Sequence, residues 1–154
     1  MKRSVGVLPY KIENGELMVY LEHPGGPFWK GKDKWSICKG EQINENAICA
    51  AIREFKEESG FDVPVDKIQF LGSVKQKSNK LITIFCVLMD IDPKKMKSNT
   101  FSMEYPRGSG EIKEFYEMDE GRWFSLEIAK EKIFVGQRKL LIKLQERYNN
   151  GQLI

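Results

Sequence analysis

The stretch GEQINENAICAAIREFKEESGF, residues 40–61, decides how this chain folds. Its apolar residues Ile48, Ile52 and Phe55 are spaced by four and then three positions, as on one face of an α-helix. The spacing predicts a helix over residues 46–59, with these three side chains facing the core.

Both ends of this predicted helix carry residues that commonly end helices. Asn44 and Asn46 each have a side chain that can accept a hydrogen bond from a free backbone N–H of the first turn, and the sequence leaves the choice between them open. Gly60 follows the last turn and can adopt the positive φ angle that ends many helices. We therefore expect Gly60 in the left-handed conformation.

Three glutamates, Glu54, Glu57 and Glu58, share the helix face opposite the apolar side chains, because they lie three and four residues apart. Like charges at this spacing repel by about 0.2–0.5 kcal/mol per pair, and the helix dipole disfavours anions near a C-terminus. A divalent cation would compensate both effects, and Mg²⁺ prefers oxygen ligands. The alternative is a solvated acidic face whose charge is diluted by Arg53 and Lys56.

The whole stretch resembles the Nudix box, whose family pattern is G-x(5)-E-x(7)-R-E-U-x-E-E-x-G-U, with U a bulky apolar residue. The match is complete from Glu45 to Phe61, including the seven residues between Glu45 and Arg53. The single departure is that four residues, instead of five, separate Gly40 from Glu45. We expect the shorter loop to approach a substrate differently, while the helix is unchanged.

This resemblance implies a role for each matching residue. Glu57 and Glu58 would be the principal ligands of a Mg²⁺ or Mn²⁺ ion, and Glu54 would be a further ligand or the base that activates water. Arg53 would orient Glu54 through a charge-assisted hydrogen bond, so Arg53, Glu54 and Glu57 are the predicted catalytic residues. Glu45 matches the first glutamate of the box, which is often an auxiliary ligand or a structural acid.

Members of the Nudix family often take one more metal-binding carboxylate from a loop shortly before an aromatic residue near the C-terminal helix. Glu117 lies six residues before Trp123 and is the predicted ligand. Glu114 and Glu120 are alternatives, and an ordinary surface position remains an open interpretation for each of the three.

A lysine-rich loop immediately before the box supplies local positive charge. The lysines within the ten residues 30–39 are Lys30, Lys32, Lys34 and Lys39. They could neutralise phosphate oxygens of a substrate, although a merely solvated loop is the alternative.

Part of this loop also resembles the family. The pair Lys39-Gly40 is similar to the Pro-Lys-Gly that introduces the box in some Nudix hydrolases, with Cys38 in place of the proline. A nucleotide base could stack on Trp29, whereas Trp35 is expected in the core. The predicted substrate-binding residues are Lys39, Gly40, Lys32 and Trp29.

The rest of the chain reads as strands followed by helices. The pair Asn14-Gly15 is a strong hairpin signal, and Ser125 can cap a helix. The predicted elements are strands over residues 4–10, 16–22, 35–38, 67–76 and 81–91, a turn at 77–80, and helices over 126–133 and 137–148. This order indicates an α/β (α+β) sandwich, a mixed sheet flanked by the box helix and the C-terminal helices, in a single domain over residues 1–154.

Composition excludes several other classes of protein. The 25 basic and 22 acidic residues leave a net charge of +3, which is too weak to predict binding to duplex nucleic acid or to a membrane. Three cysteines without C-x-x-C spacing fit a reducing cytoplasm, and no apolar run approaches the length of a membrane span. His23 is the single histidine and lies in a Pro/Gly-rich segment, where we expect a surface loop position.

Together these features predict a cytoplasmic, Mg²⁺- or Mn²⁺-dependent hydrolase that splits a diphosphate linkage in a dinucleoside polyphosphate or a nucleoside triphosphate. The expected partner is a small-molecule nucleotide, and a homodimer is a candidate assembly because many relatives pair. A catalytically silent domain that binds a nucleotide or an RNA end is the alternative, although a pure binder has no need of the complete glutamate set. A diphosphate isomerase of the same fold would need a cysteine facing the metal site, such as Cys38.

Overall fold

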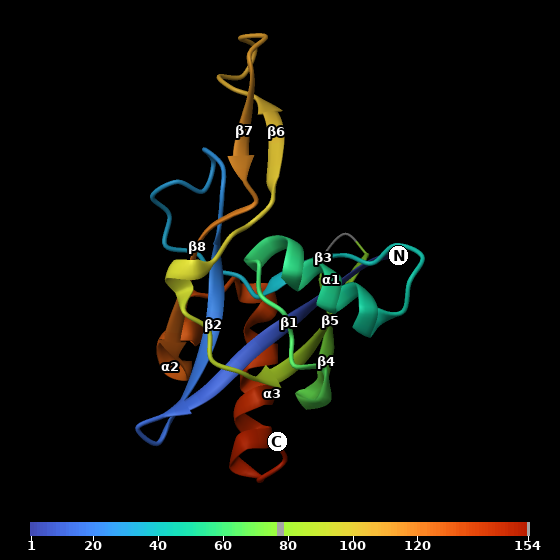
Figure 1. Ribbon diagram of the computed structural model, residues 1–154, viewed down its shortest axis with the longest axis vertical. Helices are drawn as coiled ribbons and strands as arrows, with labels where there is room; N and C mark the ends of the chain where they lie inside the picture. The colour runs from blue at the N-terminus through green and yellow to red at the C-terminus, as the bar shows by residue number, and fades with distance from the viewer. Residues whose placement is uncertain (77–78, 154) are drawn as a thin grey trace.

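A six-stranded mixed sheet forms the centre of the computed structural model, which describes residues 1–76 and 79–153 (Figure 1). Its strands are β1 (Lys2–Glu13), β2 (Glu16–Pro24), β3 (Cys38–Glu41), β4 (Ile68–Gln76), β5 (Lys80–Leu88) and β8 (Met118–Ser125). The order is β4-β5-β1-β2-β8, with β3 paired to β1. Strands β1 and β5 run parallel and the other pairs antiparallel, so the mixed sheet is confirmed.

Strand β1 divides one of its edges between two partners. Its C-terminal part pairs with β2 around the turn at Asn14 (φ 53°) and Gly15 (φ 76°), both of which have the positive φ that a two-residue hairpin turn requires. Its N-terminal part, from Ser4 to Val7, pairs with β3. The start of the 40–61 stretch is thereby hydrogen-bonded into the sheet next to the end of β2.

Two apolar cores lie on the two faces of this sheet, because consecutive side chains of β1 point to opposite sides. Leu8 and Tyr10 pack with apolar residues of α2 (Leu126–Lys132) and α3 (Arg138–Asn149), whereas Val5 and Val7 pack with α1 (Ala47–Ser59). Figure 1 shows α1 in front of the sheet and α3 behind it. The predicted sandwich is therefore confirmed.

Of the predicted apolar stripe on helix α1, Phe55 is fully buried and Ile52 is partly buried against the core. Ile48 is 37% exposed, and the residues that face the sheet are Ala50, Ala51, Phe55, Glu58 and Ser59. Because alanine side chains are short, α1 lies close to the sheet, and this turns Glu58 inward. The prediction that all three glutamates lie on the face opposite the buried apolar residues is therefore wrong for Glu58.

The ends of α1 agree with the residues that signalled them. Of the two candidate caps, Asn46 is the one used, and its side chain accepts a hydrogen bond of 2.9 Å from the N–H of Cys49. Gly60 has a φ of 82° and its N–H donates to the carbonyl of Lys56, so the left-handed helix end is confirmed.

Replacing Gly60 tests this helix end. Gly60→Val should lower the free energy of unfolding by about 1–2 kcal/mol, because a β-branched residue is strained at positive φ. An added Cβ would also lie 3.1 Å from the carbonyl oxygen of Lys97. Urea denaturation measures the change, with Gly60→Asn as the control, since asparagine tolerates this conformation better. Equal stability of the valine variant and the wild type would contradict the assignment.

The remaining predicted elements are shifted by a few residues. The short strand expected at 35–38 is β3 at Cys38–Glu41, whereas Trp35 forms only an isolated bridge and is buried in the core as expected. Ser125 caps α2 through a hydrogen bond from the N–H of Ile128. Short 3-10 turns cover Val65–Lys67, Pro93–Lys95 and Val135–Gln137. The predicted turn at 77–80 falls partly on Lys77 and Ser78, which lie outside the described residues.

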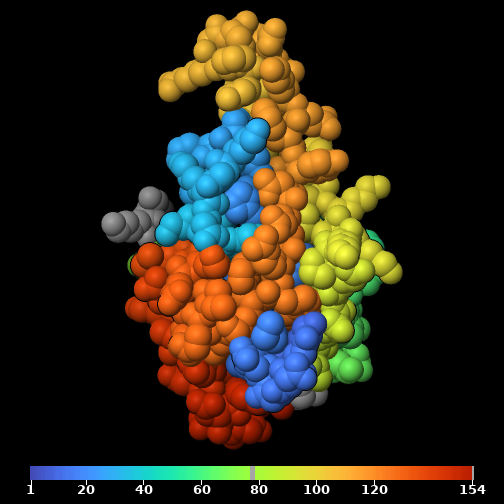
Figure 2. Space-filling model, turned by 90° about the vertical axis from the view of Figure 1, so that its left-hand side faces the viewer, coloured from blue at the N-terminus to red at the C-terminus, as the bar shows by residue number. Residues whose placement is uncertain are grey.

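One element was missed altogether. The polar segment before Trp123 contains a separate two-stranded sheet of β6 (Thr100–Glu104) and β7 (Ile112–Tyr116), which extends away from the main body (Figures 1 and 2). Most of its side chains are exposed, so it lacks the long apolar alternation by which a strand is recognised. No helix within the described ranges is long and apolar enough to cross a membrane.

Candidate active site

The three glutamates of α1 differ in how far they are buried. The side chain of Glu57 is 42% exposed and that of Glu54 is 12% exposed, whereas Glu58 as a residue is only 8% exposed. They therefore form a gradient from the solvent toward the sheet. The two inner glutamates, Glu54 and Glu58, lie where α1 meets β3, against Gly40 and Cys38.

Arg53 joins the outer carboxylates. Its guanidinium donates to Glu45 at 2.5 and 2.8 Å, to Glu54 at 2.9 Å and to Glu57 at 3.2 Å. These bonds raise the pKa of Arg53 further above its usual range, with the largest contribution from Glu45. The hydrogen bond expected between Arg53 and Glu54 is present, and it holds the Glu54 carboxylate in one orientation.

Gly40 lies directly against this carboxylate. A Cβ atom at Gly40 would lie 1.9 Å from Oε2 of Glu54 and 2.1 Å from its Cδ, so no other residue fits there without displacing Glu54. In the shortened loop that follows, Asn44 adopts a positive φ of 48°. The role of Gly40 in substrate binding stays a prediction, while its contact with Glu54 is a direct structural reason for glycine.

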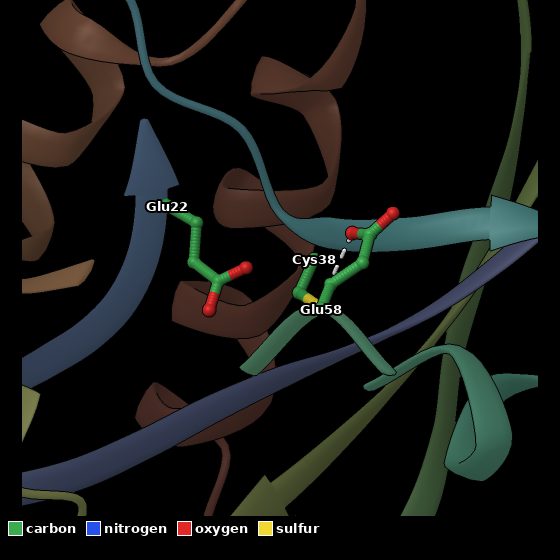
Figure 3. Close-up of side chains that lie close together, drawn as sticks. All are labelled: Glu22, Cys38 and Glu58. Atoms are coloured by element: carbon green, nitrogen blue, oxygen red, sulfur yellow. Dashed lines mark hydrogen bonds between the residues drawn. The ribbon is translucent and has the colours of Figure 1, made fainter. Parts of the chain in front are cut away.

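One further acidic residue, Glu22, is buried more deeply than the glutamates of α1 and was not predicted from the sequence. Glu22, on β2, is completely buried and comes together with Cys38 and Glu58, so that one ligand atom from each lies within 4.8 Å of the others (Figure 3). Tyr20 donates to Oε2 of Glu22 at 2.7 Å, and the thiol of Cys38 donates to Glu58 at 3.5 Å. Oε1 of Glu22 has no hydrogen-bond partner among the described residues.

Burial changes the protonation of this inner group. It raises the pKa of Glu22 to about 8, and it raises the pKa of Glu58 to about 8 together with the charges of Glu22 and Glu54. Burial also raises the pKa of the Cys38 thiol well above its usual range. Without a cation, both carboxylates therefore tend to hold protons at neutral pH, although Glu22 keeps one oxygen unpaired.

The donor set fits a hard divalent cation. Buried carboxylate oxygens that lack a hydrogen-bond partner are costly unless they are paired or bind a metal, and the unpaired Oε1 of Glu22 meets this condition. Oxygen ligands suit Mg²⁺ and Mn²⁺, whereas a thiol that stays protonated is a poor ligand. The carboxylates of Glu22, Glu54 and Glu58 thus offer suitable ligand atoms.

Replacing Glu22 tests its buried protonation. Between pH 4.5 and about 8, unfolding releases the proton that folded Glu22 retains, so this group makes the metal-free protein less stable as pH rises, until the effect levels off above pH 8. The free energy of unfolding of Glu22→Gln minus that of the wild type should therefore be larger at pH 9 than at pH 5. Urea denaturation in EDTA measures this, with the exposed Glu120→Gln as control. Parallel pH curves for wild type and Glu22→Gln would contradict the shift.

Glu117, the further ligand predicted outside α1, lies near Glu58. It sits between β7 and β8, its N–H donates to Asn99, and its charge contributes to the raised pKa of Glu58. Burial raises the pKa of Glu117 itself. Of the two alternatives, Glu120 pairs with Arg122 and Glu114 lies in the β6–β7 hairpin. Glu117 is thus near enough to Glu58 to affect the pKa of Glu58. The role of Glu117 as a metal ligand stays a prediction.

The predicted substrate-binding residues are divided between two places. Lys39, on β3, is partly buried, and this burial lowers its pKa, as does nearby Lys80, while Glu58 acts in the opposite direction. Lys32 instead lies over the ring of Phe28 at 3.6 Å, and Trp29 packs edge-on against Phe28 and Phe134. Lys39 and Gly40 therefore lie near Glu58 and Glu54, whereas the side chains of Lys32 and Trp29 contact residues of their own loop and Phe134.

The position expected for His23 is wrong. His23 is the penultimate residue of β2 and only 9% exposed, and it packs edge-on against Trp35. Its Nε2–H donates to the carbonyl of Lys32 at 2.6 Å, and Nδ1 lies 2.8 Å from Asp119. The strand continues further than the Pro/Gly content suggested because β8 pairs with it, so His23 anchors the lysine loop.

Comparison with known proteins agrees with this architecture. The family model described as NUDIX domain matches residues 1–144. Among curated proteins, the uncharacterized protein L534 of Acanthamoeba polyphaga mimivirus is 36% identical over 59 residues, which are 37% of this chain and 19% of that protein. The chain thus spans about a fifth of the curated relative that it matches.

Solved structures share the fold at low identity. The NUDIX domain of Shewanella oneidensis NrtR, complexed with ADP ribose, has a TM-score of 0.67 at 15% identity, covering 95% of this chain and 87% of that one. An Ap4A hydrolase from C. elegans has a TM-score of 0.65 at 18% identity, covering 97% and 99%. NrtR complexed with a 27mer DNA has a TM-score of 0.62 at 15% identity, covering 96% and 62%.

Proposed function

Because this chain belongs to the NUDIX domain family, we propose that it is a metal-dependent hydrolase that cleaves a diphosphate linkage in a nucleoside polyphosphate, as a single domain over residues 1–154. The observation that carries the proposal is the group of carboxylates between α1 and β3, with the orphaned oxygen of Glu22 beneath it. A shared fold does not by itself fix an activity, and this group supplies the chemical reason.

The proposed metal ligands are Glu54, Glu57, Glu58 and Glu117. Glu22 is proposed as a further, more deeply buried ligand. A Mg²⁺ or Mn²⁺ ion bound there would neutralise charge on the phosphate oxygens. Arg53 orients Glu54, and Gly40 leaves space for it. Glu54 or a neighbouring carboxylate takes a proton from the water that attacks phosphorus, and the products are two phosphorylated fragments.

Two substrate classes remain candidates, a dinucleoside polyphosphate such as diadenosine tetraphosphate and a nucleoside triphosphate. We favour the dinucleotide because Lys39 adjoins the acidic group and further lysines lie in the adjacent loop, which suits a long polyphosphate. The likeness to an Ap4A hydrolase supports this choice at the level of the fold. Lys39, Gly40, Lys32 and Trp29 are the proposed substrate contacts.

The proposal is tested with a substrate panel. Nucleoside triphosphates, dinucleoside polyphosphates, ADP-ribose, NADH and triphosphorylated or capped RNA are incubated with the protein and Mg²⁺ or Mn²⁺, with and without EDTA. We expect EDTA-sensitive turnover, with kcat/KM for the dinucleotide above that of every common nucleoside triphosphate. Turnover of none of these compounds, together with binding of one of them, would favour the silent sensor domain.

An isomerase is not favoured by the position of Cys38. The thiol faces the carboxylate group, as that activity would require, but Cys38 is only 1% exposed. A substrate carbon could not reach its sulfur without rearrangement of β3.

We also propose that the protein acts in the cytoplasm on small-molecule nucleotides, without duplex nucleic acid or a membrane, and that a homodimer is its candidate assembly. The net charge of +3 supports the absence of DNA binding. The fold is nevertheless shared with NrtR, which was solved with DNA and of which this chain covers 62%. Fluorescence anisotropy with a labelled duplex at physiological salt is expected to show no binding.

A further inference from the structure

A cavity of about 520 Å³ lies between the lysine loop and the β6–β7 hairpin. Gly26, Pro27 and Lys30 contribute from the loop, and Tyr105 and Phe115 contribute from the hairpin. Figure 2 shows the hairpin, in yellow-orange, rising beside the blue loop. We call this space the hairpin cavity; none of the predicted substrate-binding residues lines it.

The walls of the hairpin cavity suit a flat aromatic group. Tyr105 and Phe115 meet edge to face with their ring centroids 5.9 Å apart, and Phe101 packs against Phe115 at 6.0 Å. Tyr105 as a residue is 41% exposed, and the ammonium of Lys113 lies 5.7 Å from the centroid of its ring. The volume is within the range of roughly 300–1,000 Å³ typical of small-molecule sites.

The cavity is adjacent to the proposed metal ligands along two segments of backbone. Thr100, which lines it, follows Asn99, and the N–H of Asn99 donates to the carbonyl of Glu57 at 2.8 Å. Tyr116, which also lines it, precedes Glu117. The backbone that lines the cavity is therefore one residue away from Asn99, which bonds to Glu57, and one residue away from Glu117.

Close backbone contacts fix the loop against the hairpin. The N–H of Gly25 donates to the carbonyl of Glu117 at 2.9 Å, and a Cβ at Gly25 would lie 1.9 Å from the carbonyl oxygen of Tyr116. At Gly26, φ is 91° and an added Cβ would lie 3.0 Å from the ring of Phe101. The two consecutive glycines thus allow the walls of the cavity to approach each other.

We propose that the hairpin cavity binds the nucleoside part of the substrate, with its base against Tyr105 and Phe115. Lys30 supplies a positive charge toward the attached phosphates, while Glu114 and Asp119 can accept hydrogen bonds from sugar hydroxyls or base amino groups. The inference rests on the proposed function for the direction of the phosphates, which would extend toward Glu57 and Glu117. Binding of the nucleoside itself needs no metal.

The test separates this inference from the proposed activity by using uncharged nucleosides in EDTA. Adenosine, guanosine, cytidine and uridine are titrated into ¹⁵N-labelled protein, and amide shifts give the site and the Kd. We expect at least one nucleoside to shift amides of the loop and the hairpin. Tyr105→Ala and Phe115→Ala should each weaken its binding about tenfold, because each removes an aromatic ring on which the base stacks.

Matched variants make the result specific. Tyr105→Phe keeps the ring and should retain the affinity, whereas Tyr105→Leu should lose it. Ile112→Ala changes an exposed residue of the same hairpin that does not line the cavity, so it should bind as the wild type does. With an active substrate, the cavity variants should raise KM and leave kcat within about twofold of the wild type.

Several outcomes would overturn the inference. These are a failure of all four nucleosides to bind, shifts confined to another surface, or unchanged affinity in both alanine variants. A dimer in sedimentation that Tyr105→Ala dissociates, with nucleoside binding unaltered, would assign the rings to a second copy of the chain. Lack of hydrolysis in the substrate panel overturns the proposed function and leaves nucleoside binding in EDTA unaffected.

Discussion

Glu57→Gln and Glu58→Gln are each expected to lower kcat by at least about 100-fold, which corresponds to about 2.7 kcal/mol of transition-state stabilisation. Each substitution keeps the size of the side chain and removes the negative charge with which a cation would be held. Initial rates at saturating substrate and Mg²⁺ measure the effect. Glu120→Gln, which changes a glutamate paired with Arg122, should leave kcat unchanged.

The same variants should differ in stability without metal. Glu58 is buried, and its pKa of about 8 reflects the cost of its charge in the folded protein, so Glu58→Gln should raise the Tm in EDTA at pH 9. Glu57 is 42% exposed, so its replacement should change the Tm less. Near-wild-type turnover in both variants would reject the assignment of Glu57 and Glu58 to the metal.

Gly40→Ala is expected to lower kcat about 100-fold although it adds one methyl group. The added Cβ would overlap the Glu54 carboxylate, which must then move and break its hydrogen bond to Arg53. A displacement of about 1 Å in a catalytic site can cost this much. Steady-state kinetics measure the loss, and circular dichroism establishes that the variant is folded.

A double-mutant cycle shows whether Gly40 acts through Glu54. If it does, Gly40→Ala should cost little activity in a protein that already carries Glu54→Ala, because the side chain that it displaces is absent. Fully additive losses would instead indicate that the methyl group disturbs β3 or the substrate directly.

Local signals predicted the helix and its ends well. The helix cap and the positive φ of Gly60 depend on residues within one turn. The sequence therefore identified Gly60 and limited the cap to Asn44 or Asn46, of which the structure uses Asn46. The hairpin at Asn14 and Gly15 is equally local. The burial of α1 was predicted less well, because the short side chains of Ala50 and Ala51 face the sheet where a stripe of larger residues was expected.

Glu22 shows why part of the site could not be predicted. Its neighbours in the sequence are ordinary strand residues, and its contact with Glu58 arises only when β2, β3 and α1 come together. The available signal was a glutamate directly after the apolar run of residues 17–21, two residues after Tyr20, which donates to it. The β6–β7 hairpin was missed for a related reason, since its exposed strands are defined by pairing with each other.

Because β6 and β7 pair in a sheet of their own, changes along them leave the register of the central strands untouched. The carboxylates of Glu22, Glu54 and Glu58, in contrast, are positioned by α1 and the six-stranded sheet. Residues of the hairpin such as Tyr105 can therefore be exchanged during evolution without moving Arg53 or Glu54. Ligand preference could diversify on the hairpin while the arrangement of Arg53, Glu54 and Glu58 stays the same.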